Sequence, residues 1–385
     1  MPPSQPVDQA RAIAALAGER AAEGERERKL SADLVEALIE AGFFRLCVPA
    51  SIGGVEADTA TTVEVCEELA RGDSAAGWCI AVMSTAGMLA AYIPEEAARE
   101  AYGDTRSVVG GVFAPKGRAV TDGGAYRVTG RWPFSSGVDH CTWVMGGCIV
   151  EENGAPRMLE GGRPDVELVL FPKDDVDVID TWNVSGLRAT GSHDIAVEDL
   201  TVPRDRAASV ITRKPLAPGP LYSFPPFGLL ALTIAGTALG IGRAAIEDLV
   251  ELAGGKTPTG SSRPLAERPV TQTRIAQAKA GLLSARAFLY EAIATAWDTA
   301  ERGDPVSIEQ RAALRLAATH ATAASASAVD TAYDLGGGTS IYETSPLQKR
   351  FRDVHAATQH MLIGPSTWEL TGRLMLGLPT DIAQL

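Results

Sequence analysis

The chain has 385 residues and a formal net charge of −13. One hydrophobic core stops growing at about 250–300 residues, so two or three domains are expected. The acidic balance disfavours a nucleic-acid partner, because phosphate binding needs a clustered basic surface. Five cysteines without metal-ligand spacing indicate reduced, buried thiols, and the N-terminus has no signal-peptide pattern. We therefore expect a cytoplasmic protein with no metal site and no membrane span.

Helices are predicted from Asp8 to about Tyr102. Leu34 and Leu38 recur at helical spacing before Gly42, which favours a helix end. The same apolar periodicity continues through the rest of this part. The first quarter of the chain therefore predicts a helical domain over residues 1–107.

A β-domain is predicted over residues 108–215. The pattern changes near Val108 to short segments rich in β-branched residues and separated by turns, and Asp122-Gly123-Gly124 is a hairpin signal. The predicted strands are Ala125–Gly130, Thr142–Val150, Val166–Phe171, Val176–Asp180 and Ile195–Val202. We expect them to form a central, barrel-like domain.

Long helices return in residues 216–385 and predict an antiparallel four-helix bundle. They are Phe227–Leu252, Thr271–Arg302, Ser307–Leu335 and Pro346–Leu376. The longest apolar stretch, Phe227–Gly242, falls short of the ~20 residues of a bilayer span and predicts a buried helix. The polar segment Ala253–Arg268 is either a surface loop or a lid over a substrate. The predicted fold is thus α+β and multidomain.

The segment Lys349–His360 reads Lys-Arg-Phe-Arg-Asp-Val-His-Ala-Ala-Thr-Gln-His. It resembles the helix that closes the flavin site in the acyl-CoA dehydrogenase superfamily, whose domain order is also helical, β, helical. In the dehydrogenases a Glu nine residues after the Arg of the Arg-Asp pair removes the substrate's α-proton. Met361 stands at that position here, and no acid occurs between Asp353 and Glu369. The chain therefore resembles the oxygen-using branch, the two-component flavin hydroxylases.

The resemblance also places flavin contacts in the segment Gly130–His140, which reads Gly-Arg-Trp-Pro-Phe-Ser-Ser-Gly-Val-Asp-His. In the family a hydroxyl and a backbone amide at this strand end meet the flavin N5 edge, and an aromatic side chain meets the ring. The residues implied for these contacts are Trp132, Phe134, Ser135, Ser136 and Gly137. Protein groups of this kind orient and tune the cofactor.

Two further segments bear on the activity. Asn183–Asp194 is similar to a superfamily turn with a mainly structural role, and its His193 is expected to be exposed. Val112–Ala119 lacks the Thr-Glu-Pro loop that touches acyl-CoA in the dehydrogenases. Some dehydrogenases carry the base on the first C-terminal helix, but no acid occurs between Asp205 and Glu247. Without a general base, desaturation is disfavoured.

His360 stands directly beside the vacant catalytic position in this interpretation. In oxygen-activating relatives a His there lies near flavin C4a and N5, and imidazole can hold or release a proton near neutral pH. The alternative is a core histidine bonded to a carbonyl. On one continuous helix His355 would lie about 140° round from His360, so the two would not act on one atom. Several relatives also carry a His at a position corresponding to 81–88, where this chain has none.

More distant cofactor contacts are implied for the glycine run in Leu335–Ser340 and for the start of the predicted helix Thr271–Arg302. The run resembles a loop that approaches the flavin of an adjacent subunit in the family. The residues implied are Arg268, Gln272, Gly336, Gly337, Gly338 and, beside His360, Gln359. We expect a homotetramer for this reason.

The sequence thus predicts a two-component flavin-dependent monooxygenase with His360, Ser136 and Ser135 as catalytic residues. By resemblance, a separate reductase supplies reduced FMN or FAD, O2 forms a C4a-hydroperoxide, and one oxygen passes to an organic substrate, with an aromatic or polycyclic one as the narrower alternative. Two rival interpretations stay open. One is an acyl-CoA dehydrogenase or oxidase with an unrecognised base, and the other is a non-catalytic flavin-binding relative.

Overall fold

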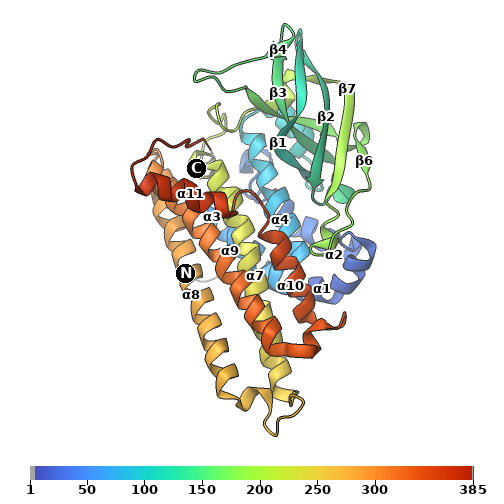
Figure 1. The fold of residues 1–385 in the computed structure, drawn as a ribbon. Helices are drawn as coiled ribbons and strands as arrows, with labels where there is room; N and C mark the ends of the chain where they lie inside the picture. The colour runs from blue at the N-terminus through green and yellow to red at the C-terminus, as the bar shows by residue number, and fades with distance from the viewer. Residues whose placement is uncertain (1–4, 384) are drawn as a thin grey trace.

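The computed structural model describes residues 5–383 and 385. The strands, which are central in chain order, form a sheet at one end of the molecule, and the N- and C-terminal helices make up the rest (Figure 1). The N-terminal helices are α1 (Gln5–Glu27), α2 (Ala32–Glu40), α3 (Thr59–Gly72), α4 (Ser74–Ala86) and α5 (Glu95–Tyr102). Helix α4 is buried along nearly its whole length. Short 3-10 turns occur at Phe43–Arg45, Ala50–Ile52, Gly87–Ala91, Val138–His140, Lys173–Asp175, Arg188–Thr190, Arg204–Arg206, Leu265–Glu267 and Gly337–Ile341.

The central strands form one sheet in the order β6-β7-β2-β1-β3-β5-β8, with β4 paired to β3. The strands are β1 (Val109–Asp122), β2 (Ala125–Ser135), β3 (Trp143–Glu152), β4 (Ala155–Pro156), β5 (Val166–Pro172), β6 (Asp177–Ile179), β7 (His193–Pro203) and β8 (Ala207–Ala208). The order has two ends, so hydrogen bonds do not close the described strands into a complete barrel, and the barrel-like shape of the domain stays a prediction. The predicted hairpin is confirmed, because Asp122 pairs with Ala125 across the turn.

Strand β1, which has 14 residues and is the centre of the sheet, was not predicted. Gly110, Gly111, Pro115 and Gly117 lower the β propensity of this segment. The strand forms nevertheless because it pairs on both sides, antiparallel with β2 and parallel with β3. The register shifts twice around Pro115, which accommodates the residue that cannot donate to the ladder.

The C-terminal helices are α6 (Pro220–Ser223), α7 (Pro226–Gly255), α8 (Pro269–Glu301), α9 (Ile308–Gly336), α10 (Pro346–Ala357) and α11 (Pro365–Met375). The prediction of one helix over Pro346–Leu376 was wrong. The chain leaves the helix after Ala357 and restarts at Pro365, because proline fits the first turn of a helix and disfavours helical geometry in the residue before it. His360 lies in the connecting segment. The helical angle between His355 and His360 therefore does not apply.

Two stretches, Ser74–Ala91 and Pro226–Gly255, have the length and apolar composition of a membrane span. In each, 94% of the most apolar window is buried inside the protein. The expectation that the stretch around Phe227–Gly242 is shorter than a bilayer span was wrong, because α7 is long and apolar enough over Pro226–Gly255. Both stretches form the middle of the protein, and α7 packs against α3, α4, α9 and α10.

The domain limits at 107/108 and 215/216 stay predictions. The secondary structure changes close to them, from helices to strands at Val109 and back to helices at Pro220. All five cysteines lie among the described residues and are buried without a disulfide.

Candidate functional site

The end of β2 carries the main candidate site, and its backbone is irregular there. Phe134 has a φ of +68° and Gly137 a φ of +69°. The reversal at Phe134 breaks the alternation of the strand, so Phe134 is 67% exposed while Ser135 and Ser136 are buried. Trp182 packs edge-on against the Phe134 ring at a centroid distance of 6.1 Å. The strand therefore ends with an exposed Phe134 ring, packed on the half-buried Trp182, beside two buried hydroxyls.

Trp132 cannot supply the aromatic surface that the sequence analysis assigned to it or to Phe134. Its side chain is completely buried in the sheet, and its indole Nε1 donates to the Gly147 carbonyl at 2.7 Å. Gly117, Gly130 and Gly146 leave the space that the indole fills, since a Cβ at any of them would approach it within 3.0 Å. Phe134 alone of the two has a ring that a ligand can reach.

A chain of buried hydroxyls leads away from Ser136. Its Oγ accepts a hydrogen bond from Trp78 Nε1 of α4 at 3.1 Å and lies 2.8 Å from Ser192 Oγ. Ser192 Oγ lies 2.6 Å from Thr190 Oγ1, which donates to the Leu187 carbonyl at 2.8 Å. We call Ser136, Ser192 and Thr190 the hydroxyl chain. It connects β2, the start of β7 and the turn between β6 and β7.

The far end of the hydroxyl chain is anchored by buried charges. Lys349 Nζ of α10 lies 2.6 Å from Asp353 Oδ2 and 2.8 Å from Asp73 Oδ1, and we call these three residues the lysine cluster. Asp353 Oδ1 accepts from the backbone N–H of Leu187 at 2.6 Å. Asp73 also caps α4, which carries Trp78. One cluster thus holds α4, α10 and the turn that begins at Leu187.

The charge states in the lysine cluster are those of ion pairs. Burial alone would raise the pKa of Asp353, but Lys349 and the Leu187 N–H outweigh it and lower that pKa below its usual value. Burial would likewise lower the pKa of Lys349, but the two carboxylates raise it. Asp353 is therefore ionised and fully engaged. It cannot act as a base toward a substrate.

His360 lies beside Trp78, with the two ring centroids 5.8 Å apart in an edge arrangement. Burial, with a smaller effect from the nearby Arg315 guanidinium, lowers the pKa of His360 to about 4. Its Nδ1 accepts from the backbone N–H of Leu362 at 3.3 Å. The imidazole is therefore neutral near pH 7 and carries its proton on Nε2, because Nδ1 is used as an acceptor.

Two buried hydroxyls near this region have no hydrogen-bond partner among the described residues. They are Ser135 Oγ at the end of β2 and Ser84 Oγ on α4. Buried polar atoms normally have partners, so such atoms point to a missing ligand or water. Ser135, Ser136 and the exposed Phe134 ring together offer polar groups and a flat apolar surface at one strand end. These residues fit the edge and face of a flavin ring.

The remaining predicted cofactor residues lie elsewhere in the chain. Gly336 and Thr339 bind Lys256 Nζ at the end of α9, and Gln272 Nε2 donates to the Ala266 carbonyl at 3.0 Å near the start of α8. Figure 1 shows that these helix ends lie at the opposite end of the bundle from the sheet. Arg268, Gly337 and Gly338 belong to the same end and are exposed. Within one chain they do not join the β2 site.

The polar segment 253–268, one of whose alternatives was a lid, also lies at that distant end (Figure 1). It cannot cover the β2 site of its own chain. Gln359, in contrast, adjoins His360, where its exposed amide donates to the Thr358 hydroxyl at 3.1 Å. His355 pairs with Asp330 at 2.8 Å and stays apart from His360.

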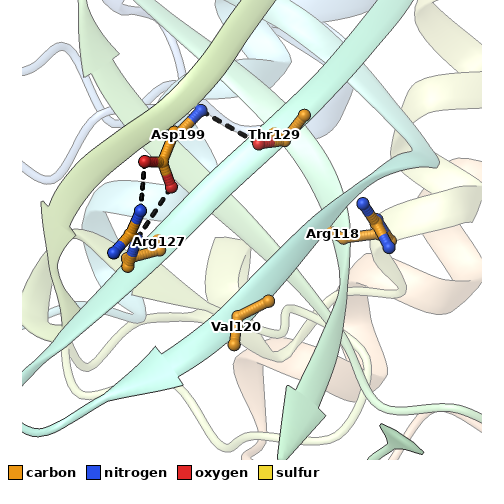
Figure 2. A pocket seen from close by; sticks show the side chains of 5 residues that line it. All are labelled: Arg118, Val120, Arg127, Thr129 and Asp199. Atoms are coloured by element: carbon orange, nitrogen blue, oxygen red, sulfur yellow. Dashed lines mark hydrogen bonds and ion pairs between the residues drawn. The ribbon is translucent and has the colours of Figure 1, made fainter. Parts of the chain in front are cut away.

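Figure 2 shows a pocket of about 350 Å³ on the sheet, lined by Arg118, Val120, Arg127, Thr129 and Asp199. Asp199 accepts from Arg127 Nε at 2.7 Å, and its backbone N–H donates to Thr129 Oγ1 at 2.9 Å. The pocket is lined only by side chains of β1, β2 and β7, and none of them belongs to the candidate site. The pocket therefore gives no support for a catalytic role, because its lining is separate from the candidate site.

Sequence reasoning missed Trp78, Thr190 and Ser192 as site residues. The turn that contains Thr190 and Ser192 was noted, but it was interpreted as mainly structural. His193 in that turn was expected to be exposed, yet it is 7% exposed and its Nδ1 accepts from the Thr181 and Trp182 backbone N–H groups. The available signal was the presence of two hydroxyl residues, Thr190 and Ser192, in one turn, since short polar side chains in a turn often bond to each other or to the backbone.

Two protein families match the chain. "Acyl-CoA dehydrogenase, N-terminal domain" matches residues 5–103, and "Acyl-CoA dehydrogenase, C-terminal domain" matches residues 232–365. Indole-3-acetate monooxygenase from Pseudomonas putida is 35% identical over 361 residues, which are 93% of this chain and 90% of that protein. The flavin-dependent monooxygenase oxygenase subunit HsaA from Rhodococcus jostii is 31% identical over 373 residues, 94% of this chain and 95% of that protein.

Solved structures agree with these matches. The 3-HSA hydroxylase from Rhodococcus sp. RHA1 superposes with a TM-score of 0.90 and 29% identity, covering 99% of both chains. XiaF from Streptomyces sp., solved in complex with FADH2 and glycerol, has a TM-score of 0.90 and 26% identity, covering 97% of this chain and 96% of its own. The similarity therefore extends over the sheet as well as over the two helical parts.

Proposed function

The chain belongs to the flavin-dependent monooxygenase branch of the acyl-CoA dehydrogenase superfamily, and we propose that it is the oxygenase component of a two-component system. Such a component uses O2 and reduced FMN or FAD from a separate reductase to oxygenate a small organic molecule. We propose an aromatic substrate, in line with relatives that are named for indole-3-acetate and resorcinol.

The state of Asp353 is the observation that carries this proposal. A dehydrogenase needs a carboxylate base, and Asp353 is the acid closest in sequence to His360. Its two oxygens are held by Lys349 and by the Leu187 N–H, and its low pKa makes it a poor base. Glu369, the next acid along the chain, is exposed on α11. These features support oxygen as the electron acceptor, because the buried carboxylate nearest to His360 in sequence is already engaged and the next acid is exposed to solvent.

We assign the site roles as follows. Ser136 and Ser135 bind the N5 edge of the flavin, Gly137 shapes the turn beside it, and Phe134 packs on the ring. His360 presents an Nε2–H donor that can hydrogen-bond an oxygen of the reacting group. The flavin, when bound in its reduced form, supplies the electrons that activate O2. The loaded site must also exclude water, which would otherwise release hydrogen peroxide before transfer.

We infer a homotetramer from the distant cofactor residues. Arg268, Gln272 and the glycine run Gly336–Gly338 cannot meet the β2 site of their own chain, so they would complete the site of a neighbour. An exposed stripe of small side chains on α8 supports close packing of helices from two subunits. Its residues are Thr273, Ala276, Ala280, Ser284, Ala287 and Ala294. We also infer a cytoplasmic location, given five buried thiols and two apolar helices that are covered by protein.

The test is to supply reduced flavin and isotopically labelled O2 to the protein with a panel of aromatic substrates. We expect one labelled oxygen atom in the product and little free hydrogen peroxide. Labelled product from none of the panel, with all oxygen released as peroxide, would contradict the proposal. The dehydrogenase alternative predicts instead that an acyl-CoA bleaches bound oxidised flavin without O2. A non-catalytic relative would bind flavin without substrate-dependent oxygen incorporation.

A further inference from the structure

We propose that Thr190 and Ser192 are positioning residues that fix the Ser136 hydroxyl as a hydrogen-bond acceptor toward the flavin. The site would then favour reduced over oxidised flavin by its hydrogen-bond direction. This inference rests on the proposed function, because it assumes that Ser136 faces the N5 edge. It concerns residues of the turn between β6 and β7, to which sequence reasoning gave only a structural role.

The direction of the hydroxyl chain follows from its far end. The Leu187 carbonyl can only accept, and it lies 2.8 Å from Thr190 Oγ1. Two oxygens at this distance repel each other unless a proton lies between them, so Thr190 donates to Leu187. Thr190 has no second proton. Ser192, at 2.6 Å, must therefore donate to Thr190.

The direction of the next hydrogen bond is fixed in the same way. Ser192 has used its single proton on Thr190, so it can only accept from Ser136 at 2.8 Å. Ser136 thus gives its proton to Ser192. The indole Nε1 of Trp78 has only a donor, and it donates to the Ser136 oxygen at 3.1 Å. Ser136 therefore keeps one lone pair that can accept a further hydrogen bond, and it has no proton left to donate.

A lone pair distinguishes the two redox forms of flavin. Nitrogen N5 carries a hydrogen in reduced flavin and is an acceptor in oxidised flavin. Ser136 in the derived state can accept from the N5–H of the reduced form. Opposite oxidised N5 it would place two acceptors face to face. A buried polar group that meets no complementary partner is costly, so the redox forms should differ in affinity.

Burial keeps this direction from reversing. Thr190 and Ser192 are 1% and 2% exposed, and Ser136 is 6% exposed, so bulk water has little access to exchange partners with them. The hydroxyl chain ends at the backbone carbonyl of Leu187, which can only accept. The backbone N–H of Leu187 donates to Asp353 of the lysine cluster, which holds this residue in place. Rotation of one hydroxyl would leave at least one close oxygen pair without a proton.

The test compares Thr190→Val with Thr190→Ser. Valine keeps the shape of threonine but removes the hydroxyl, which frees Ser192 to donate to Ser136 and Ser136 to donate to the flavin. Anaerobic titrations with oxidised and reduced flavin give the ratio of the two dissociation constants. We expect the wild-type protein to bind reduced flavin more tightly. Thr190→Val should reduce that preference about tenfold, which equals a two-electron midpoint potential about 30 mV lower. Thr190→Ser should keep the wild-type ratio.

Ser192→Ala provides a second, independent variant, because it removes the acceptor of the Ser136 proton. It should shift the ratio in the same direction as Thr190→Val, and circular dichroism checks that each variant is folded. Equal affinity of the wild-type protein for both redox forms would overturn the inference, and so would an unchanged ratio in both variants. If neither redox form binds to the folded wild-type protein, the proposed function itself fails. If both forms bind and only the ratio is wrong, the proposed function stands without this inference.

Discussion

Two buried ion clusters join the N-terminal helices to the C-terminal ones, and only one of them reaches the candidate site. In the lysine cluster, Lys349 of α10 pairs with Asp73 and Asp353. In the second, which we call the glutamate cluster, the fully buried Glu67 of α3 pairs with Arg243 of α7 at 2.7 Å and with Arg286 of α8 at 2.9 Å. Both clusters replace water around buried charges by ion pairs.

The two clusters differ in the further hydrogen-bond partners of their carboxylates. Asp353 continues to the Leu187 N–H and so to the hydroxyl chain. Beyond its two arginines, Glu67 binds only the Tyr290 hydroxyl, at 3.3 Å, among the residues that the structure describes, and Arg243 also binds Glu68 at 3.1 Å. All of these partners lie on helices. Burial and charge alone therefore do not identify a functional site here. What identifies the site is the connection of the lysine cluster to the end of β2, where the buried Ser135 hydroxyl has no partner among the described residues.

The largest effect is expected for Lys349→Met, which leaves two buried carboxylates without a cation. We expect the free energy of unfolding to fall by about 3–5 kcal/mol, because removing one partner of a buried ion pair is strongly destabilising. The variant should also lose flavin affinity, since the turn that positions Ser192 loses its anchor. Urea denaturation and flavin titration below the unfolding transition measure the two effects.

Arg243→Met is the matched control in the glutamate cluster. We expect a comparable loss of stability, about 2–4 kcal/mol, with flavin affinity unchanged while the protein stays folded. A loss of flavin affinity as large as that of Lys349→Met would remove the distinction between the two clusters.

The next effect is expected for Gly137→Ala. The φ of +69° is costly for alanine, and its Cβ would lie 2.3 Å from Met83 Sδ. We expect a destabilisation of about 2–4 kcal/mol, from a left-handed backbone and overpacking, and weaker flavin binding. Gly123→Ala in the β1–β2 hairpin has a similar φ of +56° but nothing within 4 Å. It should cost about 1–2 kcal/mol and leave flavin binding intact, and equal costs in thermal unfolding would argue against the contact with Met83.

Acidification should lower the free energy of unfolding through protonation of His360. Its pKa is about 4 in the folded protein and about 6.5 when unfolded, so the unfolded state binds more protons between these values. The stability from neutral His360 is present above the unfolded pKa and is lost as pH falls toward the folded one. We expect a loss of about 2 kcal/mol between pH 7 and about pH 5 that His360→Gln does not show. An identical pH dependence in both proteins would mean that His360 titrates normally.

The smallest effect on stability is expected for Phe134→Gly. Glycine relieves the positive φ of Phe134, but it also raises the entropy of the unfolded chain, so the net change should stay below about 1 kcal/mol. Flavin binding should weaken nonetheless, because an exposed ring is lost from the site. A variant with unchanged flavin affinity would exclude Phe134 as a contact.

Much of the fold could be predicted from the sequence because local patterns carried it. Helical periodicity in the two outer parts and β-branched segments between them gave the correct order of secondary structure. Strand β1 was missed because its glycines and Pro115 have low β propensity, and pairing on both sides outweighs that local preference. The break before Pro365 was likewise missed, although proline is a recognised helix start.

For the site, the sequence by itself determined which chemical groups are present: the hydroxyls after Phe134, the histidine next to Met361, and the lack of an acid between Asp353 and Glu369. Only the tertiary structure decided which of them meet. It buried Trp132, brought Trp78 of α4 to Ser136 and His360, and joined Thr190 and Ser192 to the same hydroxyl chain. The physical reason is that hydrogen bonds and burial depend on contacts between segments far apart in the chain, which no local pattern of residues specifies.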